Sequence, residues 1–231
     1  MPWTALDWAE NYGQTGAAAI LRGAGAVRAQ ASDTDWSKVY GGSIISHFHE
    51  FAGPVLPISF SPLVAGNRPI ELRISRIDGK DKFKLLFTVG LFAFQMIEIY
   101  VVLPAAWPVT TSRVSADPQI SFPAAILLEL AGRAAGGETV AEGFVVSRGD
   151  ADASRLVWPV GVDALIAIDQ AWPAAEAERD YGPEDEVTLL ALVPFKSTKK
   201  GVPDGKALRD WIDKNRQSSW RKHSLPAPAG C

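Results

Sequence analysis

The most constraining feature of the chain is an apolar stretch, FKLLFTVGLFAFQMIEIYVVLPAAWP, which runs from Phe83 to Pro108. Its longest part without a charged side chain extends over the 13 residues from Leu85 to Ile97, whereas a membrane-spanning helix needs about 20. Apolar residues alternate with polar ones, and β-branched and aromatic residues are enriched, as in strands. We therefore predict two buried central strands, connected near FAFQ at 92–95 and ended by Pro104.

Other segments share this extended pattern. IELRISRI alternates cleanly from Ile70, and DEVTLLALVPF ends at Pro194. VLPISFSP, from Val55, carries Pro57 and Pro62, which suit an edge strand because proline cannot donate to a β-ladder. These patterns predict a sheet built from several consecutive strands.

Helical spacing appears in three other places. SIISHFHEF begins at Ser43, SFPAAILLELAGRAAGG has Ser121 as its expected N-cap, and DGKALRDWIDKNRQSSW follows Asp204. Because strands outnumber helices and come in runs, we predict an α+β (mixed α/β) fold. Its central sheet is mostly antiparallel or mixed and is flanked by helices.

Composition divides the chain into three parts. Residues 1–42 are rich in Ala and Gly and are expected to form a helical or irregular extension. Residues 43–222 form the predicted domain, and residues 223–231, SLPAPAGC after one histidine, are expected to be a disordered tail. The sole cysteine is Cys231, so no internal disulfide forms and a reducing compartment is the default.

The charged residues also indicate where the protein is located and which classes of partner are expected. Asp7 and Glu10 stand where a signal peptide carries positive charge, and Arg22 interrupts the apolar run, so we predict a cytoplasmic protein. A net charge of −3 gives no support for nucleic-acid binding. Neither a membrane partner nor a cofactor is expected, and the oligomeric state stays open.

The chain matches motifs typical of active sites only in part. His47, His49 and Glu50 lie close together in GGSIISHFHE, which leaves a metal-dependent hydrolase as an alternative, although a zinc site needs three or four cooperating ligands. GVPDGKA differs from a phosphate-binding loop in its spacing, and Ala207 replaces the residue that would bind magnesium. We predict a polar helix face, with no catalytic residues.

Charge is strongly uneven near the end of the chain. From Gly161 to Leu190 there are eight acidic side chains and one basic one, whereas from Lys196 to Lys222 there are nine basic and three acidic ones. Acids with interleaved aromatic residues can steer and anchor a basic partner. The predicted partner-binding residues are Trp172, Glu176, Glu178, Asp180, Tyr181, Glu184, Asp185 and Glu186. A plain solvated loop is the alternative.

Several stretches, taken in order, resemble the suppressor-of-fused-like domain family. That family often shows a Thr-Val-Gly strand, a following methionine, a strand with an acidic residue, a Leu-Pro-x-x-Trp turn and a late strand with proline. The resemblance covers roughly residues 43–220 and departs from the family pattern at Ala106, where an acid often precedes the tryptophan. The matching residues are Thr88, Val89, Gly90, Met96, Glu98, Leu103, Pro104, Trp107, Val193 and Pro194.

The resemblance implies a mixed α/β domain without catalysis. Animal members bind and restrain a transcription factor, and bacterial members resemble immunity proteins that neutralise a toxin by binding it. We therefore expect a bacterial stand-alone member that binds a protein, with a cognate toxin as the expected partner. A self-assembling regulatory or structural module, joined through an exposed strand such as VLPISF, remains a second alternative.

Overall fold

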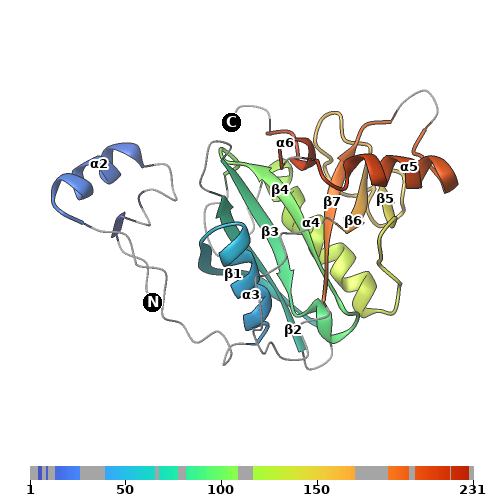
Figure 1. The fold of residues 1–231 in the computed structure, drawn as a ribbon, viewed down its shortest axis with the longest axis horizontal. Coiled ribbons are helices and arrows are strands. Elements are labelled where there is room, and N and C mark those ends of the chain that lie inside the picture. The colour runs from blue at the N-terminus through green and yellow to red at the C-terminus, as the bar shows by residue number, and fades with distance from the viewer. Residues whose placement is uncertain are drawn as a thin grey trace.

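The computed structural model describes residues 5–6, 9, 14–26, 40–65, 68–77, 82–108, 117–169, 187–197, 201–218 and 220–228. They contain a seven-stranded sheet in the order β1-β2-β3-β4-β7-β6-β5, with helices on both faces (Figure 1). The predicted α+β class is confirmed. No described helix is both long and apolar enough to span a bilayer.

The sheet is mixed because one central pair is parallel. β4 and β7 run parallel, and all other neighbours are antiparallel. VLPISFSP is an edge strand, as predicted, and its pairing with β2 is interrupted by register shifts. The strands are β1 (Val55–Ala65), β2 (Arg68–Ile77), β3 (Phe83–Val89), β4 (Ile97–Pro104), β5 (Val145–Ser147), β6 (Ala164–Asp169) and β7 (Thr188–Phe195).

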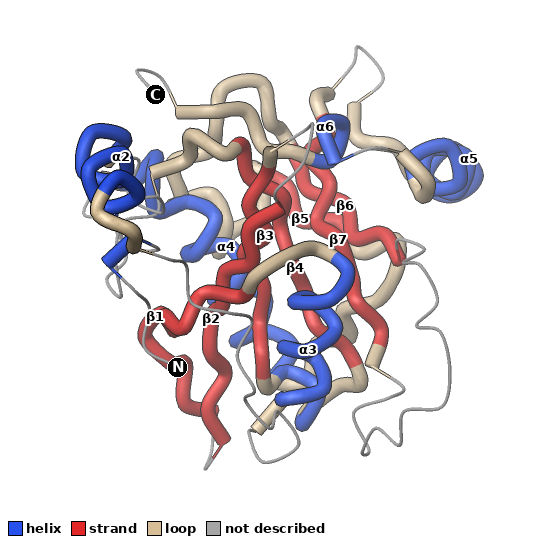
Figure 2. Tube along the Cα trace, turned by 60° about the vertical axis from the view of Figure 1, so that its left-hand side comes forward, coloured by secondary structure: helices blue, strands red, loops and turns tan. Residues whose placement is uncertain are grey.

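Helices cover the two faces of this sheet unequally (Figures 1 and 2). The long helix α4 packs through residues such as Leu130 on one face, whereas α3 and α5 contribute Phe48 and Ile212 to the core of the other. The sheet is therefore the middle layer of three. The helical elements are α2 (Thr15–Gly23), α3 (Gly42–Phe51), η2 (Leu91–Ala93), α4 (Pro118–Ala135), α5 (Gly205–Asn215) and α6 (Trp220–His223).

The apolar stretch forms β3, η2 and β4 at the centre of the sheet, as predicted. Every residue of β3 is buried. Phe87 stacks on Phe48 of α3 with ring centroids 3.8 Å apart, and Tyr100 of β4 meets the edge of Phe48 at 5.7 Å. Phe87 belongs to the core under α3, whereas Leu91 belongs to the core under α4, because the chain turns at Gly90 and leaves the strand.

Two expected boundaries differ from the structure. α4 begins at Pro118 rather than near Ser121, because the Asp117 carboxylate accepts a hydrogen bond from the Gln119 amide at 2.9 Å and caps the helix earlier. Residues 223–228 were expected in a disordered tail, but Leu225 is buried. Burial of its apolar side chain, with backbone pairing to β4, fixes this segment.

The N-terminal extension contains the predicted weak helix as α2. Ala18 of that helix packs with Leu6 and Ala9 in a small cluster of its own, separate from the two cores that cover the sheet. The described residues of α2 therefore pack in this small cluster rather than in either core of the sheet.

Candidate functional site

The predicted acidic binding residues lie outside the described residues, but the structure defines where their segment is attached. The acidic segment, residues 170–186, begins directly after Asp169 at the end of β6 and ends just before β7. Because these antiparallel strands are neighbours, both ends of the segment lie at the same edge of the sheet. The eight residues concerned are Trp172, Glu176, Glu178, Asp180, Tyr181, Glu184, Asp185 and Glu186.

The guanidinium group of Arg216 holds Asp169, the last residue of β6, directly before this segment. Arg216, just after α5, donates from Nη1 to the Asp169 carbonyl at 2.7 Å and from Nη2 to Glu142 Oε2 at 2.8 Å. The Asp169 amide in turn donates to Glu142 Oε1 at 3.0 Å. Charge-assisted bonds of this geometry are stronger than neutral ones, so the end of β6 is tied to both the loop before β5 and the end of α5.

The side-chain carboxylate of Asp169 lies in this cluster. Burial, together with the nearby charge of Glu142, raises its pKa, and Arg216 opposes that shift. The Asp213 carboxylate is also near Arg216, with 3.8 Å between Asp213 Oδ1 and Arg216 Nη2. The carboxylates of Glu142, Asp169 and Asp213 are therefore all close to Arg216, at the point where the acidic segment starts.

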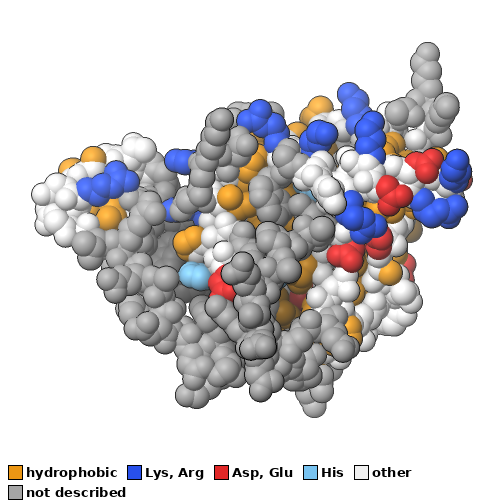
Figure 3. All heavy atoms as spheres, in the orientation of Figure 1, with side chains coloured by type: hydrophobic (Ala, Val, Ile, Leu, Met, Phe, Trp, Pro, Cys, Tyr) orange, Lys and Arg blue, Asp and Glu red, His pale blue; other side chains and the backbone are white. Residues whose placement is uncertain are grey.

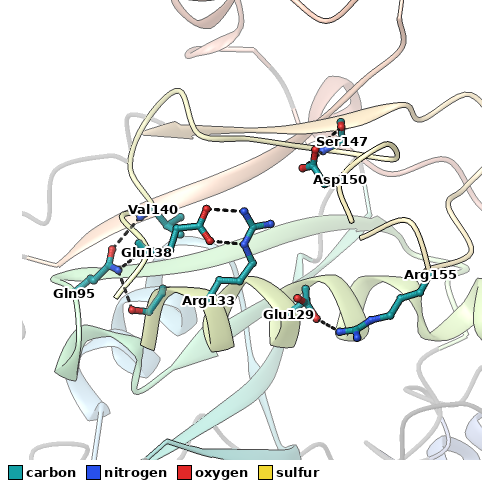
Figure 4. A network of polar contacts seen from close by, with 9 residues as sticks. Gln95, Glu129, Arg133, Glu138, Val140, Ser147, Asp150 and Arg155 are labelled. Carbon is teal, nitrogen blue, oxygen red and sulfur yellow. Dashed lines mark hydrogen bonds and ion pairs between the residues drawn. The ribbon is translucent and has the colours of Figure 1, made fainter. Parts of the chain in front are cut away.

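A second network fixes the neighbouring η2 turn to the end of α4 (Figure 4). Gln95 Nε2 donates to the carbonyls of Ala134, at 3.0 Å, and Glu138, and its Oε1 accepts from the Val140 amide at 3.0 Å. The side-chain amide of Gln95 thus bonds to three backbone groups at and after the end of α4, as a neighbouring strand would.

The carboxylate of Glu138 is held on the same loop. Arg133 reaches it with two bonds of 2.5 and 2.6 Å, and the guanidinium also lies 5.3 Å from the centre of the Phe144 ring. The hydrogen bonds from Arg133 lower the pKa of Glu138. This carboxylate is therefore ionised at neutral pH, and its two bonds to Arg133 fix its orientation.

Met96 adjoins the second network and contacts the start of β7. It follows Gln95, is 44% exposed, and its carbonyl accepts from the Thr188 amide at 3.0 Å, where the acidic segment rejoins the sheet. We call Met96, Glu138, Glu142, Asp169 and Arg216 the rim. The rim combines an exposed flexible apolar side chain with fixed carboxylates, which is a composition suited to contact with another protein.

Glu98 shows why several family-motif residues have structural roles. Its side chain is fully buried, and Oε1 accepts from the amides of Gly90, at 2.8 Å, and Phe92, at 3.2 Å. Oε2 has no hydrogen-bond partner among the described residues. Burial raises the pKa of Glu98 to about 7, and hydrogen bonds from Thr88 and from backbone amides 90–92 oppose that shift.

Gly90 makes this amide cradle possible. Its φ is +111°, and a Cβ there would lie 2.4 Å from the carbonyl oxygen of Pro69. Only glycine fits both the left-handed backbone and the close approach. The Thr-Val-Gly motif is thus explained by the turn and its buried carboxylate.

The Leu-Pro-x-x-Trp motif has a similar explanation. Trp107 is 1% exposed, its amide donates to the Pro104 carbonyl at 2.9 Å, and its indole donates to the Ile120 carbonyl in α4 at 3.1 Å. Lys84 Nζ donates to the Trp107 carbonyl at 2.8 Å, and burial, then repulsion from Arg76, lowers the pKa of Lys84 to about 8. The motif joins β4 to α4.

The residues of the alternative metal site all lie on one helix. His47, His49 and Glu50 occupy α3, and the Glu50 carboxylate accepts from the Ser46 hydroxyl at 3.5 Å. Burial lowers the pKa of His47. Within the described parts of the chain, no group of three or more His, Cys, Asp or Glu side chains is placed to hold a metal ion.

Surface charge follows the sequence pattern. In the view of Figure 3, Lys and Arg side chains gather over α5 and around α6, with Asp and Glu side chains among them. The basic stretch seen in the sequence therefore forms a helix surface beside the rim, to which it contributes Arg216. Sequence analysis missed Glu142 and Arg216 as a pair, because 74 positions separate them.

Three comparisons with known proteins were made. No family model matches the chain, and no curated protein matches it either. Among solved structures, the fold is similar to one described as a "Putative SUFU (suppressor of fused protein) homolog from Neisseria gonorrhoeae FA 1090". The TM-score is 0.49 and the identity 13%, over 81% of this chain and 96% of that chain.

Proposed function

We propose that the chain is a non-catalytic protein-binding domain that neutralises a cognate bacterial toxin by binding it. The observation that carries the proposal is the rim. Its carboxylates are held by arginines, and its contacts reach Asp169 and Thr188, which lie on either side of the acidic segment, while Met96 is exposed. A basic protein surface complements this charge, and an apolar anchor inside a polar border is the usual arrangement of a tight interface.

The arrangement of the charges also supports specific rather than diffuse attraction. Arg216 and Arg133 hold Glu142 and Glu138 in position, so a partner meets oriented carboxylates without having to order them. The acidic segment would add long-range steering, and its Trp172 and Tyr181 would serve as anchors.

The test is capture of partners on the tagged chain from its native host, followed by binding measurements with the purified partner. We expect one stoichiometric partner that carries a toxin domain. Reversing charge with Glu184→Lys and Asp185→Lys should weaken binding by about tenfold or more and flatten its salt dependence.

The matched control makes the same change of charge on α5. Asp204→Lys and Asp210→Lys alter two exposed acids outside the rim and should leave affinity nearly unchanged. Equal effects of the two double variants would show that net charge, rather than this surface, governs binding. Unchanged affinity and salt dependence in the first variant would refute the assignment of the surface.

Neither alternative function gains a specific observation. A metal-dependent hydrolase would need bound zinc, iron or manganese, which metal analysis of the purified protein measures directly. Self-assembly through β1 would require an unobstructed edge, whereas this strand carries two prolines and register shifts. Sedimentation that shows one mass at all concentrations would exclude it.

A further inference from the structure

The sheet has an unusual junction where β4 and β7 part. Their parallel pairing covers only Ile97–Tyr100 and Thr188–Ala191. Beyond it, the C-terminal segment, residues 220–225, takes the place beside β4. Ser224 forms a parallel bridge with Val102, and the Leu225 amide donates to the Val102 carbonyl at 2.9 Å. α6, the start of this segment, lies near the same end of β4 and β7 in Figure 1.

Burial and polar contacts both hold this segment. His223 and Leu225 are each 1% exposed, and Leu225 belongs to the core under α4. His223 Nε2 lies 2.7 Å from Ser218 Oγ and 2.9 Å from the Asn215 carbonyl, and the Ser218 hydroxyl donates to the same carbonyl at 2.7 Å. The histidine therefore connects the C-terminal segment to the end of α5.

The contacts also assign the proton on this ring. Since Nε2 faces a carbonyl oxygen, it carries the hydrogen and donates. The same proton prevents Nε2 from acting as a base toward Ser218, although the two side chains are close enough to resemble a nucleophile and its base. The pair is a helix cap made with a neutral histidine.

Protonation of His223 would place a full charge in this buried position. Burial lowers the pKa of His223, the bond to the Asn215 carbonyl opposes that shift, and the charge of Lys222 adds to the lowering. β7 carries no ionisable side chain, and the only acid in β4 is the buried Glu98. Other charged groups on the neighbouring turns are Arg221 of α6 and Asp213, Lys214 and Arg216 at the end of α5.

We propose that residues 220–225 form an acid-sensitive latch, in which protonation of His223 releases them from β4. The released state lets the charged imidazole reach water and leaves the Val102 carbonyl without its intramolecular partner. Among the described residues, the strand pairing of this segment is limited to the bridge to Val102, and the segment lies near the end of the described chain. It can therefore leave without separating β4 from β3 or β7 from β6.

The direction of the effect follows from proton linkage. A histidine whose folded-state pKa is lowered stabilises the docked segment above its ordinary value of 6.5, and this stability is lost as the pH falls below that value. Population of the released state in acid rises about tenfold for each unit by which docking lowers the pKa.

The test is hydrogen exchange of the Leu225 amide by NMR between about pH 7.5 and about pH 5, expressed as protection relative to the intrinsic rate. We expect protection of Leu225 to fall in acid while that of Ile166, in the centre of β6, is retained. The imidazole of His223 is titrated in the same samples. The midpoint of the loss should follow its pKa, which should lie below the ordinary histidine value of 6.5.

Two variants separate the latch from general acid sensitivity. His223→Gln stays neutral and can still donate to the Asn215 carbonyl, so its Leu225 protection should not depend on pH. His49→Gln should behave as the unchanged protein. If the segment does not dock at any pH in His223→Gln, the test rests on the unchanged protein. There, the midpoint at which Leu225 protection is lost should agree with the midpoint of the His223 titration. Constant Leu225 protection, or a midpoint unrelated to His223, would overturn the latch.

Discussion

At the scale of single residues, buried polar side chains explain most of the motif positions. Glu98, Lys84 and Gln95 each meet backbone groups that the strands and helices leave without partners. A buried polar group costs free energy unless it is hydrogen-bonded, so these residues restrict which turns the chain can form. Their types follow from the surrounding backbone, and no catalytic role is needed to account for them.

The carboxylate of Glu98 should make stability depend on pH. Its folded-state pKa is about 7 against an ordinary value of 4.5, so its stabilising contribution is present in acid and is lost as the pH rises between these values. The loss amounts to about 3 kcal/mol over that range. Glu98→Gln should match the unchanged protein near pH 5 and be more stable near pH 8, as measured by urea unfolding.

An exposed carboxylate provides the control for this measurement. Asp210→Asn changes an exposed residue of α5 and should leave the pH dependence as it is. If Glu98→Gln loses stability with rising pH as steeply as the unchanged protein, the buried carboxylate is not the cause.

At the scale of elements, contacts between the ends of helices and strands position the rim. α4 ends where Arg133 binds Glu138, η2 is tied there by Gln95, and Arg216 connects α5 to β6 (Figure 4 shows the first two). None of these elements carries the rim alone. Its geometry depends on how the turns after the elements meet at one edge of the sheet.

Gln95 offers a direct test of this arrangement. Gln95→Glu keeps the shape but replaces the donating Nε2 by an oxygen that faces the carbonyls of Ala134 and Glu138. We expect a loss of about 1–3 kcal/mol in the free energy of unfolding. Gln119→Glu, at an exposed position near the start of α4, should change stability by less than about 0.5 kcal/mol. Equal losses would mean that the Gln95 contacts contribute nothing specific.

At the scale of the whole molecule, one sheet serves two cores. Leu127 of α4 and Ile45 of α3 are both almost fully buried, but in clusters on opposite faces. Because β3 and β4 contribute residues to both clusters, loss of either should be transmitted through the shared strands. The layers are expected to unfold as a unit.

Truncation on each face tests this cooperativity. Leu127→Ala and Ile45→Ala should each lower stability by about 2–5 kcal/mol, and both should shift a single thermal transition. The transition is followed by far-ultraviolet circular dichroism and by tryptophan fluorescence. Separate transitions by the two probes, or a second transition in only one variant, would show that the faces unfold independently.

Sequence periodicity by itself determined the central strands, the flanking helices and the edge position of β1. Alternation in β3 and β4, and the prolines of β1, act within a few neighbouring residues, and the sheet retained these local preferences. The uneven charge located the acidic segment, and the family resemblance marked Thr88, Val89, Gly90 and Glu98, although not the contact between the Gly90 amide and the Glu98 carboxylate.

Tertiary structure alone decided which distant residues meet. Glu142 and Arg216 are 74 positions apart, and Val102 pairs with Ser224 across the rest of the chain. Neither contact has a local sequence signal, because the partners are far apart in the sequence. The bridge of Val102 to Ser224 lies beyond the point at which the parallel pairing of β4 with β7 stops. The same geometry buries Leu225 in a stretch whose composition is typical of disorder, since packing and backbone pairing outweigh local preference there.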